Sequence, residues 1–141
     1  MLMLMALIEA PGCVEEDAVS TALRVLIADD NDLVRNALRE LIDSEDQFTV
    51  VALADGVDTA VAAMRDTQPD VAVVDVRMPG GGPAAVREIL AVAPSTLVIA
   101  CSAYDDAFSR DEMTAAGVVA YLVKGRDDVI SGLRRACGLD V

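Results

Sequence analysis

Residues 71–82 constrain the fold of this chain more than any other segment. They begin with the apolar run Val-Ala-Val-Val, continue into a single carboxylate, Asp75, and end in the turn-forming sequence Pro-Gly-Gly-Gly. Such a run is typical of a strand buried on both faces, as in parallel sheets covered by helices. Ligands in these sheets gather at the carboxyl ends of the strands, which makes Asp75 a candidate site residue. An Asp in this position can also serve only as a turn or cap residue.

Strand-like segments alternate with segments of helical periodicity along the rest of the chain. The predicted strands cover residues 24–30, 48–53, 71–74, 96–101 and 118–123. The first helix should expose Arg35 and Arg39 and bury an apolar face made of Leu33, Val34, Ala37, Leu38, Leu41 and Ile42. The fourth helix carries Phe108 and Met113 as its large apolar residues. Five such units predict an α/β fold, a flavodoxin-like doubly wound (βα)5 sandwich with a five-stranded parallel sheet in the order 2-1-3-4-5.

The composition predicts one soluble domain and argues against several classes of function. The 141 residues are 54% hydrophobic, and we assign residues 23–141 to a single domain. A formal net charge of −13 repels nucleic-acid phosphates and anionic membrane surfaces. The longest apolar stretch, residues 1–8, is far shorter than the ~20 residues that span a bilayer. We interpret residues 1–22 as an N-terminal extension, either disordered or produced by a misplaced start.

The predicted strand order brings polar residues from four strands to one edge of the sheet. The residues at these strand ends are Asp29, Asp30, Asp75, Ser102 and Lys124. Three neighbouring carboxylates repel one another, and a hard divalent cation such as Mg²⁺ relieves that repulsion. A carboxylate beside such an ion can attack phosphorus and form an aspartyl phosphate. Lys124 and Ser102 offer hydrogen-bond donors to the phosphoryl oxygens.

These motifs resemble the receiver domain of two-component response regulators. The matching pieces are Asp29-Asp30 after the first strand, Asp75 in Asp-Val-Arg-Met-Pro-Gly, Ser102 after the fourth strand, and Tyr-Leu-Val-Lys-Gly at residues 121–125. Each piece is weak alone, but four in the expected order are a specific signal. The resemblance covers residues 24–138, and the last motif is most similar to receivers that are usually joined to a LuxR-type helix-turn-helix.

The resemblance implies a role for each matching residue. Asp75 would be the phosphoacceptor, and Ser102 and Lys124 would hold the phosphoryl group. Tyr121 would respond to phosphorylation by a change of rotamer, turning inward as Ser102 moves toward the phosphoryl group. The implied Mg²⁺-binding groups are Asp30 and Asp75 directly, the backbone carbonyl of Arg77, and Asp29 mainly through water.

The resemblance also implies partners and a limit on activity. A sensor histidine kinase would donate the phosphoryl group, and a homodimer could form through the helix after Asp105, the strand at 118–123 and the last helix. The chain would catalyse only its own phosphotransfer and autodephosphorylation. Its 141 residues include no helix-turn-helix segment, so we expect neither DNA nor membrane binding by this chain alone. Three cysteines without metal-type spacing are typical of reduced thiols in a cytoplasmic protein.

Two features depart from the receiver pattern. Gly125 stands where many receivers have a proline that makes a cis bond, which leaves the isomer of the Lys124–Gly125 bond open. Three glycines at 80–82 stand where many receivers place an acidic residue and a glycine. We expect these glycines to loosen the loop beside Asp75.

Two alternative functions remain open at this stage. The first is a receiver-like binding module that works without phosphorylation, and the intact set Asp29, Asp30, Asp75, Ser102 and Lys124 argues against it. Taken alone, Ser102 would be a turn residue, Tyr121 an aromatic at the edge of the core and Lys124 a solvated charge. The second is a small flavin- or nucleotide-binding enzyme on the same fold. The Asp-Asp-Asn sequence at 29–31 disfavours it, because it repels anionic ligands in the absence of a metal.

Overall fold

The computed structural model describes residues 22–139, in which five strands alternate with five helices. The strands are β1 (Leu23–Ala28), β2 (Phe48–Ala54), β3 (Val71–Asp75), β4 (Leu97–Ser102) and β5 (Ala120–Val123). The helices are α3 (Asp32–Asp43), α4 (Val57–Thr67), α5 (Pro83–Val92), α6 (Ala107–Ala116) and α7 (Val129–Ala136). The expected N-terminal extension, residues 1–22, lies outside the described residues except for Ala22.

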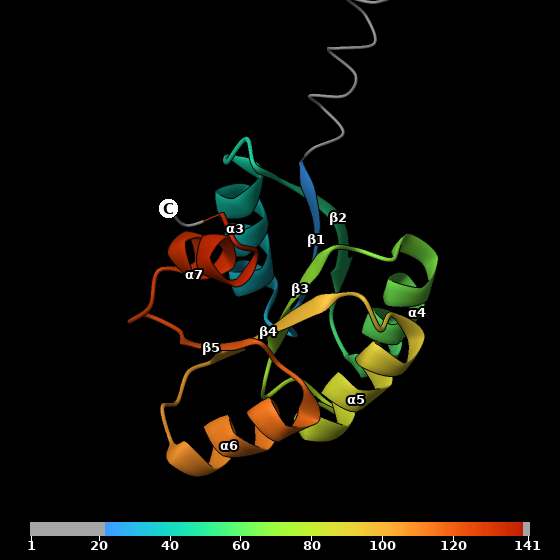
Figure 1. Cartoon of the computed structure of the whole chain (residues 1–141), viewed down its shortest axis with the longest axis vertical. Coiled ribbons are helices and arrows are strands. Elements are labelled where there is room, and N and C mark those ends of the chain that lie inside the picture. The colour runs from blue at the N-terminus through green and yellow to red at the C-terminus, as the bar shows by residue number, and fades with distance from the viewer. Residues whose placement is uncertain (1–21, 140–141) are drawn as a thin grey trace, which may run out of the picture.

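The strands form one parallel sheet in the predicted order β2-β1-β3-β4-β5. Figure 1 shows α3 and α7 on one face of this sheet and α4, α5 and α6 on the other. The register pairs Asp75 at the end of β3 with Cys101, and Ser102 at the end of β4 with Val123. The doubly wound α/β fold is therefore confirmed, and all five strands end at the same edge.

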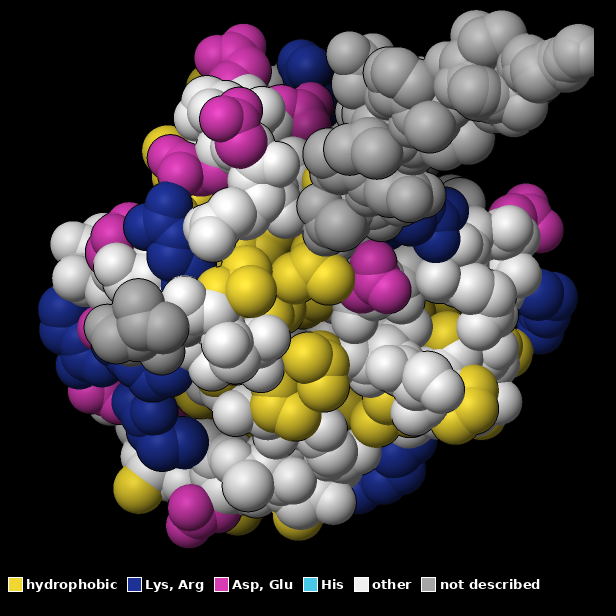
Figure 2. Space-filling model, turned by 45° about the horizontal axis from the view of Figure 1, so that its top comes forward, with side chains coloured by type: hydrophobic (Ala, Val, Ile, Leu, Met, Phe, Trp, Pro, Cys, Tyr) yellow, Lys and Arg dark blue, Asp and Glu magenta, His cyan; other side chains and the backbone are white. Residues whose placement is uncertain are grey.

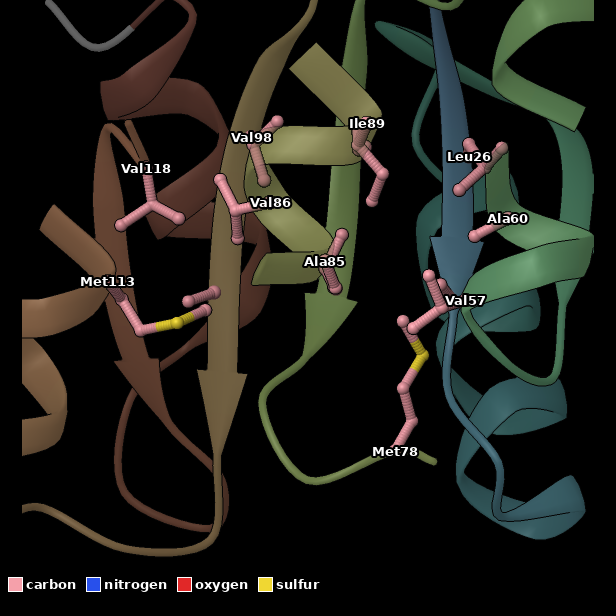
Figure 3. Packing of buried hydrophobic residues seen from close by; sticks show 14 of the residues in the cluster. Leu26, Val57, Ala60, Met78, Ala85, Val86, Ile89, Val98, Met113 and Val118 are labelled. Atoms are coloured by element: carbon pink, nitrogen blue, oxygen red, sulfur yellow. The ribbon is translucent and has the colours of Figure 1, made fainter. Parts of the chain in front are cut away.

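Each face of the sheet has its own hydrophobic core. On one face, alternate strand residues such as Leu26 and Val98 pack with α4 and α5 residues, including Ala60 and Ile89 (Figure 3). On the other face, strand residues such as Val73 pack with residues of α3 and α7. Because successive side chains of a strand point to opposite faces, burial of both faces requires an uninterrupted apolar run. All five residues of β3 are buried for this reason.

Several apolar residues that the helical spacing placed inward are exposed. Leu33 is 82% exposed because it lies nine residues before the buried Ile42, and at 3.6 residues per turn this places it on roughly the opposite side of α3. Leu41 is 44% exposed on the flank of the same helix. Phe108 is 71% exposed because it lies five residues before the buried Met113 on α6. The inward stripe of α3 is therefore narrower than predicted, whereas no inward position was predicted for Phe108.

The edge of the sheet at which the strands begin has a partly apolar surface (Figure 2). Figure 2 shows apolar side chains at the surface of this end of the molecule, with charged side chains around them. Leu23 and Leu97, the first residues of β1 and β4, are only partly buried.

Within residues 22–139, no helix has the length and apolar character needed to cross a membrane.

Two cysteines lie in the described part of the chain, and both are free thiols. Cys101 lies in β4 and is 2% exposed. Burial raises the pKa of its thiol to about 12. The Cys101 thiol therefore stays protonated near neutral pH, the form in which a thiol is a poor nucleophile and metal ligand.

Candidate metal centre

Three aspartates form an acidic cluster where the strands end. Asp29 and Asp30 follow β1, and Asp75 is the last residue of β3. Each offers a carboxylate oxygen, and these oxygens lie within 4.8 Å of one another. Asp29 and Asp75 are 2% and 6% exposed, whereas Asp30 is exposed to solvent. The adjacency of β1 and β3 in the sheet brings these distant parts of the sequence together.

Lys124 supplies a positive charge to this cluster. Its Nζ atom lies 2.9 Å from Asp29 Oδ2 and 3.2 Å from Asp75 Oδ1. The backbone N–H of Lys124 donates to the carbonyl of Ser102 at 2.7 Å, which continues the pairing of β4 and β5 up to the site. The Lys124 backbone is therefore held by its hydrogen bond to β4, and the ammonium group is held by the two carboxylates.

The charged groups of the cluster shift one another's pKa values. Burial raises the pKa of the Asp75 carboxyl above its usual value. A hydrogen bond from the Arg77 backbone N–H opposes this shift, the Asp29 charge adds to it, and Lys124 opposes it. Burial alone would lower the pKa of Lys124, but its contacts with Asp29 and Asp75 outweigh burial and raise it. Lys124 therefore stays charged near neutral pH, while charge on Asp75 is disfavoured.

Asp29 and Asp30 differ in how far their carboxylates are already engaged. Asp29 Oδ1 accepts a hydrogen bond from the backbone N–H of Asn31 at 2.9 Å, and Asp29 Oδ2 accepts one from Lys124 Nζ, also at 2.9 Å. Asp30 has no hydrogen-bond or ion-pair partner within residues 22–139. Asp30 is thus the carboxylate of the pair that can bind a cation without losing an existing contact.

The loop after Asp75 contains a hydrogen-bonded turn, and the expected loosening of this loop by its glycines stays a prediction. The N–H of Gly81 donates to the carbonyl of Met78 at 2.8 Å, and Gly80 and Gly82 have positive φ values of 72° and 81°. A Cβ atom on Gly81 would lie 2.6 Å from that same carbonyl oxygen, so only glycine fits without displacing backbone. The glycines therefore shape the loop that holds Arg77.

Gly125, the other departure from the receiver pattern, has a simple outcome. The bond between Lys124 and Gly125 is trans, since no cis peptide bond occurs within the described residues. Gly125 has a φ of 81°, a conformation that glycine adopts readily.

Ser102 and Tyr121 lie beside the cluster and are joined through Tyr104. Ser102 is 1% exposed, and its Oγ accepts the backbone N–H of Tyr104 at 3.1 Å. Tyr121 donates its hydroxyl proton to the backbone carbonyl of Tyr104, also at 3.1 Å. The guanidinium carbon of Arg77 lies 4.3 Å from the centre of the Tyr104 ring. Tyr121 is 8% exposed, so its side chain lies inward, and its response to phosphorylation stays a prediction.

Sequence reasoning missed the contribution of Arg35, which it assigned to the outer face of α3. Its Nη1 donates to the backbone carbonyl of Asp29 at 2.8 Å, and its Nη2 lies 2.5 Å from Asp32 Oδ1. Helical side chains lean toward the N-terminus of their helix, and Arg35 is one turn after the capping residue Asn31. This spacing was the available signal that Arg35 reaches back to the loop after β1.

The cluster has the donors that a hard divalent cation prefers. Three carboxylates supply oxygen atoms, two are nearly buried, and the charged form of Asp75 is disfavoured in the metal-free protein. Mg²⁺ is bound in proteins by one or two carboxylates together with waters and phosphate oxygens. The residues of this edge therefore fit Mg²⁺.

Comparisons with known proteins give a consistent picture. A family model described as response regulator receiver domain matches residues 25–131. The response regulator GacA of Pseudomonas viridiflava is 35% identical over 104 residues, which cover 73% of this chain and 49% of that protein. The chain thus spans about half the length of the curated relatives it matches.

Solved structures agree with the sequence comparisons. A LuxR-family two-component response regulator from Aurantimonas sp. SI85-9A1 has a TM-score of 0.78 at 26% identity, covering 83% of this chain and 86% of that chain. The signal receiver domain of the putative response regulator NarL from Mycobacterium tuberculosis has a TM-score of 0.75 at 27% identity, covering 83% and 98%.

The electrostatics of the cluster predict that Asp75→Asn stabilises the metal-free protein. A neutral amide of the same shape avoids the cost of charging Asp75 beside Asp29, so the melting temperature in chelator should rise by about 2–5 °C. Mg²⁺ should raise the melting temperature of the wild type and have a smaller effect on the variant. Thermal unfolding followed by circular dichroism measures both. Asp66→Asn, which removes an exposed carboxylate of α4, is the control, and equal shifts in the two variants would contradict this prediction.

Proposed function

The chain belongs to the response regulator receiver domain family, and we propose that Asp75 accepts a phosphoryl group from a sensor histidine kinase in a Mg²⁺-dependent reaction. The observation that carries this proposal is the contact of Lys124 with Asp75 and Asp29 inside the three-aspartate cluster. Receiver domains of response regulators are signalling modules, and the fold and relatives of this chain fit that class. We further propose that it catalyses only its own phosphotransfer and autodephosphorylation.

In the proposed transfer, a carboxylate oxygen of Asp75 attacks the phosphorus of a phosphohistidine. The new P–O bond forms as the P–N bond breaks, and the electron pair leaves with the imidazole nitrogen. A bound Mg²⁺ would neutralise charge on the phosphoryl oxygens. Lys124, which contacts Asp75 in the resting protein, can then pair with a phosphoryl oxygen, and the Ser102 hydroxyl can donate to another.

The metal would be held by the chain's own oxygen atoms. We assign Asp30 and Asp75 as direct ligands together with the backbone carbonyl of Arg77, and Asp29 as a ligand mainly through water. The free carboxylate of Asp30 and the engaged carboxylate of Asp29 support this ranking. The direct contact of Asp29 is with Lys124, which Asp29 keeps in place during the reaction.

We propose that the output is a surface made by α6, β5 and α7, used for a partner or for a homodimer. Tyr121 lies on β5 and Ser102 at the end of β4, so a change at Asp75 can reach this surface through two neighbouring strands. The mechanism would be a shift between two arrangements, one of which binds the phosphoryl group better. A receiver-like binding module that works without phosphorylation is the alternative, and the complete set of site residues argues against it.

The first test is phosphorylation itself. Incubation with acetyl phosphate or a phosphorylated histidine kinase should add one phosphoryl group to Asp75 only when Mg²⁺ or Mn²⁺ is present. Intact-mass spectrometry measures the gain, and Asp75→Asn should abolish it. Equal incorporation in that variant or in excess chelator would refute the assignment. If the wild type fails to bind beryllium fluoride with Mg²⁺, the alternative function is favoured.

The second test is the ranking of the two neighbouring aspartates. Asp30→Ala should weaken Mg²⁺ or Mn²⁺ binding by about tenfold or more, because it removes a direct ligand. Asp29→Ala should weaken binding less, since it removes a water-mediated contact. Metal titration by calorimetry compares the two variants. Equal losses would show that Asp29 and Asp30 bind the metal in the same way.

The third test concerns nucleic acid and location. We propose that this chain alone does not bind DNA, because its net charge of −13 opposes phosphate contacts. A titration with duplex DNA at physiological ionic strength should give no saturable binding, and salt-sensitive binding there would contradict the proposal. We also assign the chain to the cytoplasm, where its free thiols Cys101 and Cys137 would stay reduced.

A further inference from the structure

A network of charged side chains next to the acidic cluster has no part in the proposed phosphoryl transfer. It joins the loop between β4 and α6, the helix α6, and the loop between β5 and α7. The carboxylate of Asp105 contacts Arg110 at 2.5 Å and Arg126 at 2.6 Å. Arg126 also contacts Asp127 at 3.1 Å. Asp105 is therefore the carboxylate that bridges two arginines from different segments.

This network covers the ring of Tyr121. The guanidinium carbon of Arg110 lies 4.6 Å from the centre of that ring, within the range of a cation–π contact. The Tyr121 hydroxyl donates to the carbonyl of Tyr104, in the same loop as Asp105. The ring is thus held at its face by Arg110 and at its tip by the loop.

The same loop reaches the hydroxyl of Ser102. The backbone N–H of Tyr104 donates to Ser102 Oγ, and the backbone carbonyl of Tyr104 accepts a hydrogen bond from the Tyr121 hydroxyl. A shift of the loop would therefore alter the surroundings of Ser102 and Tyr121 together. The contacts that hold this loop and Arg110 in place therefore also set the position of the Tyr121 ring.

We propose that Asp105 is a positioning residue that keeps Tyr121 buried while Asp75 is unphosphorylated. Its carboxylate offsets the repulsion between Arg110 and Arg126 and holds Arg110 over the ring. The inference rests on the proposed function, because it treats the position of Tyr121 as the signal of phosphorylation. Its consequence is that the surface of α6, β5 and α7 is largely formed before phosphorylation.

The exposure of the network limits the size of this effect. The side chains of Asp105, Arg110 and Arg126 are 43%, 38% and 53% exposed, and exposed ion pairs contribute little and are screened by salt. The bridge therefore biases an equilibrium by about two- to fivefold and does not lock it. By thermodynamic reciprocity, the same bias should favour phosphoryl binding by the same factor.

The experiment uses the fact that the chain has only two tyrosines, Tyr104 and Tyr121. Tyrosine-selective isotope labelling gives two sets of ring signals, and a soluble paramagnetic agent broadens each according to its exposure. Tyr104 is 54% exposed and Tyr121 is 8% exposed, so the two sets are easily told apart. In metal-free Asp105→Asn, we expect the broadening of the Tyr121 signals to increase at least about twofold.

Matched variants separate this effect from a general loss of charge. Asp111→Asn removes an exposed carboxylate from the same helix, has no part in the bridge, and should leave Tyr121 protected. At about 1 M salt, where the Debye length is about 3 Å, the wild type should approach Asp105→Asn, while the variant should change little. Arg110→Gln removes the guanidinium that Asp105 holds over the ring and is the substitute if Asp105→Asn fails to fold. Equal protection of Tyr121 in the wild type and the bridge variant overturns the proposal.

Beryllium fluoride with Mg²⁺ distinguishes failure of this inference from failure of the proposed function. Asp105→Asn should bind this phosphoryl mimic about two- to fivefold more weakly than the wild type, and binding should restore the protection of Tyr121. A wild type that does not bind the mimic refutes the proposed function, while the metal-free comparison still tests the bridge. A wild type and variant that bind it equally refute the coupling through Asp105.

Discussion

The burial of two carboxylates around one ammonium group is the interaction on which the rest of this site depends. Asp29 and Asp75 are almost inaccessible to water, and removal of Lys124 would leave their buried negative charges uncompensated. The charges are compatible with folding only if Lys124 arrives between them. Its arrival depends on β5 pairing with β4 in one register, because the Lys124 backbone is tied to Ser102. The register of β5, at the edge of the sheet, therefore determines whether Lys124 reaches the carboxylates at the ends of β1 and β3.

The fold and the central cluster could be predicted from sequence because a simple constraint produces them. Strands covered by helices on both faces must be apolar throughout, so β3 is evident in the sequence and Asp75 marks its end. The strand order then places the remaining charges at the same edge. Residues such as Leu33 were misplaced because apolar spacing alone does not fix which side of a helix meets the sheet. Arg35 was assigned outward for the same reason, although its long side chain reaches back over the first turn.

Other features could not be predicted because they depend on backbone groups and exact approach distances. The three glycines after Asp75 indicate a turn, but they do not show that the Met78 carbonyl approaches Gly81 closely and accepts its N–H. The position of Tyr121 follows from a bond to a backbone carbonyl and from a guanidinium held by a carboxylate in another segment. No spacing rule in the sequence reports such contacts.

The two hydrogen bonds at Tyr104 belong to the backbone, whereas the contact with Arg77 belongs to its aromatic ring. Any residue except proline supplies the same N–H and carbonyl. Position 104 can therefore change its side chain, and with it the contact with Arg77, while the link between Ser102 and Tyr121 is kept. Under the proposed function, the lifetime of a modification at Asp75 and its transmission to Tyr121 would thus be open to separate adjustment at a single position.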